Sequence, residues 1–211
     1  MKNEVLDFIQ QSSFPCIMAK AVAQKGHLVI HETRHLETSE SISAIQSKLY
    51  AFIDHFRQNQ HKLSSFILII KDHRLEKFNQ FENKFYQFLK LLNQKDKLLY
   101  PPDPRVASIP QDNNFSYSIK SEAFFLVALH PESPRWSRRF RYPGIVFNPH
   151  VQFEKLREKN LFDKIKKAIR KRDMLLQGSV NPMLNDFGER SEVFQYLGRP
   201  YGPHDPVPLL I

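Results

Sequence analysis

The apolar residues of this chain recur with two different spacings. Steps of three and four residues predict helices over residues 3–11, 41–58 and 75–92. Two apolar runs, 66–70 and 123–129, predict buried strands, because each is short and rich in β-branched or aromatic residues. The third helix carries a stripe of phenylalanine and leucine, which is typical of a core-facing side. The chain therefore combines one-sided helices with fully buried strands.

Weaker patterns predict three more strands and two more helices, at 27–32, 115–119, 145–147, 151–159 and 161–176. Residues 115–119 alternate apolar and polar side chains, as an edge strand does. Residues 17–23 are compatible with either helix or strand. The order of elements predicts an α+β fold with a mixed open sheet packed with amphipathic helices. We expect a single domain over residues 1–200 and a Pro-rich C-terminal tail over 201–211.

Composition supports a folded protein in a reducing compartment. The 211 residues are 41% hydrophobic and include 18 phenylalanines, which is enough to fill a core. A single cysteine excludes an intramolecular disulfide. The N-terminal segment lacks the apolar centre of a signal peptide, and no apolar run approaches the length of a membrane span. We therefore expect a cytoplasmic protein without a membrane partner.

The chain is strongly basic, with a net charge of +9. This charge favours anionic partners such as nucleic acid, or ligands that carry phosphates or carboxylates. Much of the excess lies in residues 164–172 (KIKKAIRKR), for which a solvated helix face is the simpler explanation. The sequence has no P-loop and no Gly-rich dinucleotide fingerprint, and only six glycines, which argues against a phosphate cradle.

The densest polar cluster is residues 130–157, directly after the buried strand at 123–129. This segment holds two histidines, a tryptophan and five arginines. A core strand that leads into polar residues can hold a site rigidly while loops present it. Three of its arginines could bind carboxylates with bidentate geometry, or form a surface ion-pair network: Arg135, Arg138 and Arg139. Trp136 could stack on an arginine or on a flat ligand.

Two histidines, His130 and His150, flank this cluster. In a strand, His150 and Glu154 would face the same way, whereas a helix would pair them at i and i+4. Either geometry could orient an imidazole or bind a metal, although no third metal ligand is specified locally. Each histidine is equally compatible with a hydrogen-bonded structural role.

Cys16 is the only sulfur nucleophile or thiolate ligand in the chain. Pro15 fixes the backbone before it, and a helix that starts near Cys16 would stabilise a thiolate through its free amides. Such a thiolate could bind zinc, act as a nucleophile or bind a haem iron, and the alternative is a small core residue. Four acidic residues could bind a cationic substrate or serve as caps and ion pairs: Asp173, Asp186, Glu189 and Glu192.

Several ordered motifs carry a resemblance to a known family. They are Phe14-Pro15-Cys16, HPESPRWSRRF (130–140), NPHVQFEKLR (148–157), RKRDMLLQGSVNPML (170–184) and GERSEVFQYLGR (188–199). With these motifs the chain resembles the YqcI/YcgG family, which includes the haem-dependent guanidine N-hydroxylase of guanitoxin biosynthesis. The ordered set is specific and extends from residue 14 to residue 199.

The resemblance implies an α+β domain that binds haem b, activates O2 and hydroxylates a guanidine or amine nitrogen of a small molecule. Electrons would come from a separate reductase. Thiolate ligation suits this chemistry, so Cys16 is the expected iron ligand, with His130 and His150 as rivals. Arg135, Arg138 and Arg139 would neutralise the propionates, and Glu154 and Glu192 are the expected carboxylates for the guanidinium.

Two other functions compete with this expectation. A haem-binding or haem-sensing protein without turnover would use the same residues. A basic nucleic-acid-binding protein would explain the charge and the cluster of arginine and aromatic residues. The absence of a familiar nucleic-acid-binding motif makes nucleic acid the weaker partner.

Overall fold

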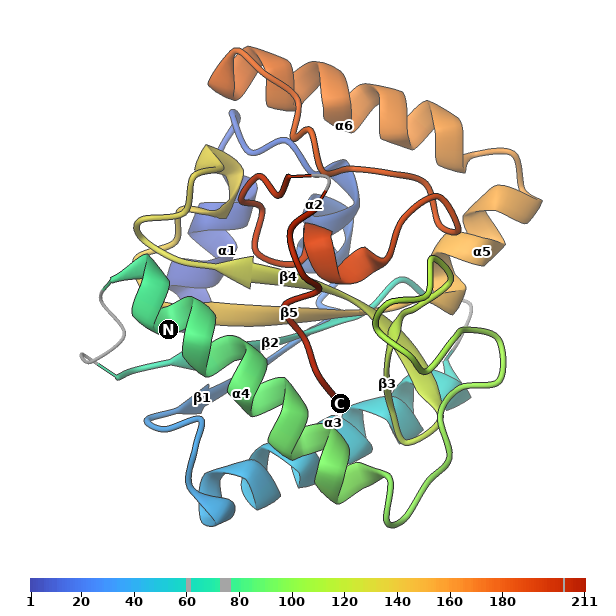
Figure 1. Ribbon diagram of the computed structural model, residues 1–211. Helices are drawn as coiled ribbons and strands as arrows, with labels where there is room; N and C mark the ends of the chain where they lie inside the picture. Colours follow the sequence, from blue (N-terminus) through green and yellow to red (C-terminus); the bar gives the residue numbers. More distant parts are fainter. Residues whose placement is uncertain (60–61, 73–76, 203) are drawn as a thin grey trace.

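The computed structural model describes residues 1–59, 62–72, 77–202 and 204–211. A five-stranded sheet in the order β1-β2-β5-β4-β3 forms its centre, with helices on both faces (Figure 1). The strands are β1 (Leu28–Thr33), β2 (Ser65–Ile70), β3 (Tyr117–Ile119), β4 (Glu122–Leu129) and β5 (Gly144–Pro149). β1 and β2 are parallel and the other neighbours are antiparallel, which confirms the α+β class and the mixed sheet.

One face of the sheet packs against two long helices, α3 (Ser39–Gln58) and α4 (Phe78–Asp96). The phenylalanine stripe of α4 is core, as predicted, and Phe81, Phe85 and Phe88 have no exposed surface. Alternate side chains of β2, β4 and β5 complete this layer: Phe66, Leu68, Ile70, Phe124, Leu126, Ala128, Ile145 and Phe147. Residues 73–76, where the predicted helix was expected to begin, lie outside the described residues. We call this side the sealed face.

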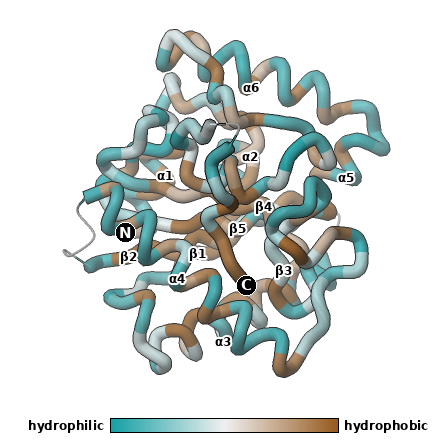
Figure 2. The backbone as a smooth tube through the Cα atoms, viewed as in Figure 1, coloured by the Kyte–Doolittle hydropathy of each residue, from teal (hydrophilic) through white to brown (hydrophobic). Residues whose placement is uncertain are grey.

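The opposite face carries α1 (Lys2–Gln10), α2 (Ile17–Gln24) and α6 (Phe162–Gln177), and α5 (Val151–Glu158) lies at one end. α1 and α2 pack near Ile67, Ile69 and Leu129 to form a smaller apolar cluster. Phe125 and Val127 of β4 point to this side and stay half-buried. In Figure 2 the hydrophobic colour lies mainly on the central strands, while α6 is largely hydrophilic. We call this side the open face.

Short turns and the C-terminal segment close the structure. The 3-10 turns η2 (Trp136–Arg138) and η3 (Glu192–Gln195) lie between the longer elements. α6 ends at Gly178, whose left-handed backbone (φ 76°) suits a residue without a side chain. In the Pro-rich tail, Tyr201 and Leu209 are buried, so this tail packs on the domain. Within the described residues, no helix combines the length and apolarity needed to cross a membrane.

Candidate functional site

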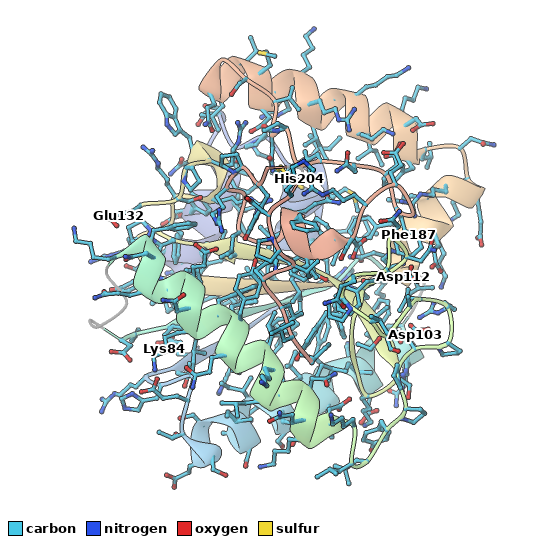
Figure 3. The ribbon with its side chains drawn as sticks, viewed as in Figure 1. Lys84, Asp103, Asp112, Glu132, Phe187 and His204 are labelled. Carbon is cyan, nitrogen blue, oxygen red and sulfur yellow. The ribbon has the colours of Figure 1, made fainter. Side chains whose placement is uncertain are left out.

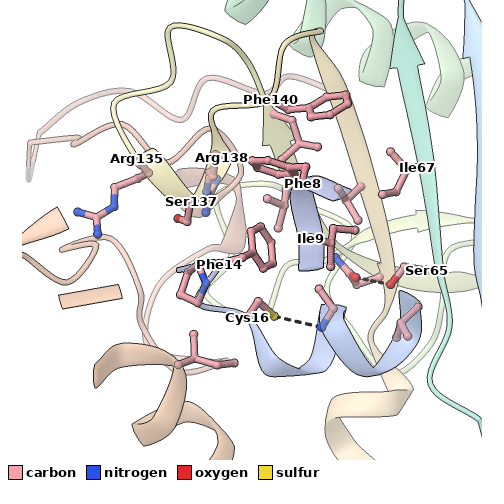
Figure 4. Close-up of a pocket in the computed structure, with 18 of the residues that line it drawn as sticks. Phe8, Ile9, Phe14, Cys16, Ser65, Ile67, Arg135, Ser137, Arg138 and Phe140 are labelled. Atoms are coloured by element: carbon pink, nitrogen blue, oxygen red, sulfur yellow. Dashed lines mark hydrogen bonds between the residues drawn. The ribbon is translucent and has the colours of Figure 1, made fainter. Parts of the chain in front are cut away.

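Two adjoining cavities lie on the open face. The first, of about 220 Å³, lies among α1, α2 and the segment around η2, and the second, of about 270 Å³, lies among β4, α5 and α6 (Figure 4 shows the first). Eight residues line both: Cys16, Ala19, Val22, Ser65, Val127, Asn148, Ile169 and Leu184. Each volume is below the roughly 300–1,000 Å³ of ordinary ligand pockets. A ligand as large as a cofactor would therefore have to occupy both.

Cys16 lies on the wall that the two cavities share. It is the N-cap of α2, and its Sγ accepts a hydrogen bond from the Ala19 amide at 3.4 Å (Figure 4). Residues 17–23, which the sequence left open between helix and strand, are thus helical, and the helix begins directly after Cys16. Burial raises the pKa of the Cys16 thiol, and the opposing effect of the Ala19 and Met18 amides is smaller. The thiol form of Cys16 is therefore favoured, and binding of a metal would require it to lose its proton.

Arg138 is a buried cation on the wall of the first cavity. Its Nη1 donates to the carbonyl oxygens of Gln195 at 3.0 Å and Tyr196 at 2.6 Å. Burial lowers its pKa to about 10, which still leaves the guanidinium charged at neutral pH. Among the described residues, no carboxylate lies within ion-pair distance of it. The charge of Asp173 acts on it from beyond ion-pair distance, and Arg135 offsets part of that effect. A buried charge without a direct partner is costly, so this position favours an anionic ligand group.

Arg135 lines the same cavity but already has a carboxylate. Its Nη2 binds Asp173 at 2.5 Å and the Ser179 carbonyl oxygen at 2.6 Å. Within the described part of the chain, Arg135 Nε and Asp173 Oδ1 are buried and lack a hydrogen-bond partner. Buried polar atoms are normally paired. These two atoms are therefore a donor and an acceptor that the described residues leave unpaired in the wall of the first cavity.

Arg139 does not join the other two arginines. Its side chain is exposed, Nε donates to the Ser133 carbonyl oxygen at 2.8 Å, and the guanidinium lies 5.8 Å from the centre of the Trp136 ring. The predicted stacking of Trp136 on an arginine is present. Arg139 lines neither cavity, so Arg135 and Arg138 are the arginines of this group that face the site.

His150 lies in the second cavity between two carboxylates. It precedes α5, so the helical pairing applies, and Nδ1 lies 3.1 Å from Glu154 Oε1. On the other side, Nε2 lies 3.4 Å from Glu192 Oε1. Burial lowers the pKa of His150, but the hydrogen bonds and charges of Glu192 and Glu154 outweigh it, so the pKa is raised overall. Both nitrogens are thus already engaged.

The two glutamates have different positions. Glu192 is buried, lines the second cavity and accepts a hydrogen bond from Ser116 Oγ at 2.7 Å. Glu154 is half-buried and accepts a hydrogen bond from Arg105 Nη1 at 3.5 Å. It lines neither cavity, so it contacts the site only through His150. Asp186 also lines the second cavity, where Lys166 Nζ donates to it at 2.9 Å.

His130 lies away from the site. It is fully buried, its Nδ1 accepts from the Glu132 amide at 3.0 Å, and its ring stacks on Phe81 of α4 at 5.2 Å. It lines neither cavity. The structural role that the sequence left open for a histidine is the one its surroundings support.

Comparison with known proteins now adds to this geometry. The model of the YqcI/YcgG family matches residues 5–209. The chain belongs to the YqcI/YcgG family. It is also similar to a Bacillus subtilis (strain 168) protein named "Uncharacterized protein YqcI", with 24% identity over 197 residues that cover 87% of this chain and 74% of that protein. No solved structure matches the chain.

Cys16 and Arg138 are residues of this site in the YqcI/YcgG protein that could hold a cofactor. Among the described residues, no group of three or more His, Cys, Asp or Glu side chains could hold a metal ion. A haem brings four nitrogen ligands of its own and needs only an axial donor from the protein. Cys16, which lines the same cavity as Arg138, would be that donor.

Two contributors to the site had no signal in the sequence. Ser116 binds Glu192 from a residue just before the edge strand, and Arg105 binds Glu154 from the segment YPPDPR. Both lie far from their partners along the chain, and neither belongs to a local motif. Their role becomes visible only once the sheet brings these segments together.

Proposed function

We propose that this YqcI/YcgG protein is a haem-dependent monooxygenase of the cytoplasm that N-hydroxylates a guanidine or amine group of a small molecule. It would use O2 and electrons from a separate reductase. The observation that carries the proposal is the position of Cys16 on the wall shared by two largely apolar cavities. One cavity is lined by the buried Arg138, which no described carboxylate contacts, and the other by the buried carboxylate of Glu192.

Haem b combines an apolar ring, an iron that needs an axial ligand, and two carboxylates. Cys16 would bind the iron, and its sulfur already accepts a hydrogen bond from the Ala19 amide. Arg138 would bind one propionate, and Arg135 Nε offers a further donor. When bound, haem with a thiolate ligand would supply the oxygen-activating chemistry. The residues present therefore fit the group.

Apolar side chains that remain half-buried on the open face support the binding of a large apolar ligand. Phe125, Val127, Val146, Ile165 and Ile169 are apolar residues that line one or both cavities, and all are half-buried. Burial of apolar surface contributes about 25 cal/mol per Å². A planar apolar cofactor would cover these side chains and gain that free energy on binding.

Glu192 is the group in the second cavity that would bind a cationic substrate. The cations Arg157, Lys166 and Arg170 line the same cavity, and Lys166 is paired with Asp186. A carboxylate has about four acceptor positions, and Ser116 and His150 occupy only part of those on Glu192. A guanidinium could use the remainder with charge-assisted geometry. His150 and Ser116 would hold Glu192 in place, while Arg105 and Glu154 would hold His150.

The basic helix gives little support to nucleic-acid binding. Three of its cations bind other parts of the domain. Lys166 binds Asp186, Arg170 binds the Leu184 carbonyl oxygen and Arg172 binds the Phe14 carbonyl oxygen. The charge of residues 164–172 is therefore partly a means of attaching α6 to the domain.

Visible absorption of protein expressed with a haem precursor tests the proposal. We expect an intense Soret band, and a ferrous carbon monoxide spectrum of the thiolate type. Cys16→Ser keeps the side chain's size and should abolish or shift that band, whereas His130→Gln should not change its position. Mass spectrometry of guanidines and amines incubated with the reduced protein should show a gain of one oxygen atom.

Three outcomes would contradict parts of this proposal. A colourless protein would remove haem altogether. A Soret band unchanged in Cys16→Ser but lost in His150→Gln would transfer ligation to the histidine. Haem binding without any oxygenated product would leave a haem-binding or haem-sensing protein.

A further inference from the structure

The outer side of α6 carries a basic stripe that the cavities do not explain. Lys164, Lys167 and Lys171 follow one another at steps of three and four residues, so they share one side of the helix. All three are exposed, and the ion pairs of α6 with Asp163 and Asp186 among the described residues are made by Lys166 instead. Figure 3 shows α6 at the edge of the molecule with side chains directed away from it.

The same side of α6 ends in exposed apolar residues. Met174 is 45% exposed and Leu175 is 79% exposed. Trp136, 49% exposed, lies next to this end of the helix, because its amide donates to Gln177 Oε1 at 2.9 Å. Single exposed apolar residues are common, but Met and Trp are enriched in protein interfaces, whose rim is polar. We call Lys164, Lys167, Lys171, Met174 and Leu175 the α6 surface.

The opposite side of the same helix lines the proposed cofactor site. Ile169 lines both cavities together with Cys16. Arg172 donates to the carbonyl oxygens of Ser12 at 2.5 Å and Phe14 at 3.0 Å, which attaches α6 to the loop that carries the cysteine. The α6 surface is thus separated from the cavities by about one helix diameter, roughly 10–12 Å.

We infer that the α6 surface is the docking site of an acidic electron-transfer protein. The inference rests on the proposed function, which requires an outside reductant: R–NH2 + O2 + 2 e− + 2 H+ gives R–NHOH + H2O. In each docking event one electron leaves the reduced carrier, which is oxidised, and reaches the cofactor iron, which is reduced. No covalent bond forms or breaks. Lysines complement the acidic carrier, and Met174 and Leu175 provide the apolar contact.

Charge reversal on two faces of the molecule tests this docking site. The probes are an acidic [2Fe–2S] ferredoxin and a flavodoxin, and calorimetry and NMR titration at low and high salt measure their binding. We expect Lys167→Glu with Lys171→Glu to weaken carrier binding by about tenfold or more at low salt. The matched control is Lys48→Glu with Lys90→Glu, which makes the same charge change on exposed positions of α3 and α4 and should alter binding less than about twofold.

A second variant tests the apolar part of the surface. Leu175→Gln keeps a good helix former and the net charge, and should weaken binding equally at low and high salt. In contrast, the effect of the lysine pair should fade as salt screens it. Stopped-flow reduction of the haem-loaded protein should slow in parallel with the loss of binding, while the Soret band and reduction by dithionite stay unchanged.

The outcomes separate this inference from the proposed function. Equal weakening by the α6 pair and the control pair would overturn the docking site, as would the failure of both carriers to bind at low salt. Loss of single-stranded DNA binding in the α6 pair, with no carrier binding, would also overturn it. A haem that dithionite reduces but neither carrier does would overturn the docking site and leave the proposed function standing. Protein that binds no haem, but whose α6 surface still binds the carriers, would overturn the proposed function and leave the docking site standing.

Discussion

The two faces of the sheet differ in how completely they are packed. On the sealed face, α3 and α4 cover Phe124 and Leu126 of β4 without leaving exposed surface. On the open face, the intervening residues Phe125 and Val127 stay half-buried beside the cavities. Adjacent residues of β4 thus face a filled core on one side and the cavities on the other. The sealed face supplies stability, and the open face keeps the space in which a ligand can bind.

The same contrast applies to the helices. The inner side of α4 is apolar and fully buried, whereas α6 is attached largely through charged side chains, and its one buried residue is Asp173. Arg135 and Arg172 hold it by an ion pair and by backbone carbonyl oxygens. A helix held in this way can cover a cavity without filling it.

The largest expected difference in unfolding free energy lies between two truncations, one on the sealed face and one on the open face. Leu89→Ala removes a fully buried side chain from α4 and should lower the free energy of unfolding by about 2–5 kcal/mol. Ile169→Ala removes a half-buried side chain of α6 that already borders empty space, and should cost about 1 kcal/mol. Urea unfolding of the cofactor-free protein measures both. Equal losses would refute the contrast between the faces.

Enlarging two adjacent residues of β4, one on each face of the sheet, should give a smaller difference in unfolding free energy. Leu126→Trp overpacks the sealed face and should cost about 1–3 kcal/mol. Val127→Trp adds more volume but places it in the cavities, and should change stability by less than about 1 kcal/mol. Urea unfolding again measures the effect. Haem titration adds a second readout, because Val127→Trp should also reduce haem binding. A larger stability loss for Val127→Trp would contradict the assignment of the faces.

Much of the sealed face could be predicted from the sequence. The helical repeat of Phe81, Phe85 and Phe88 and the continuous apolar run of β2 are local patterns, and the structure places both in the core. The cluster at 130–157 likewise contained Arg135, Arg138 and His150, which line the cavities. Local periodicity and composition suffice where a residue's neighbours in sequence decide its burial.

The rest of the site depends on contacts between distant segments. No local pattern distinguishes Arg138, which faces a cavity, from Arg139, which points outward, because a 3-10 turn decides their directions. Nor does it distinguish His130 from His150, since one meets the rings of α4 and the other meets Glu192, 42 residues away along the chain. Only the tertiary fold distinguishes Arg138 from Arg139 and His130 from His150.

The smallest expected effect concerns the charge of His150 on the open face. Glu154 and Glu192 raise its pKa, so folding favours the imidazolium. Its contribution to stability is complete below the pKa of an unfolded histidine, about 6.5, and is lost as pH rises through the raised pKa of the folded state. The difference in unfolding free energy between wild type and His150→Gln should therefore be largest near pH 6 and shrink toward pH 9. Urea unfolding across this range measures it, with the exposed His55→Gln as the control. A difference that grows with pH would mean that the fold favours neutral imidazole, and that the open face holds no buried cation between these carboxylates.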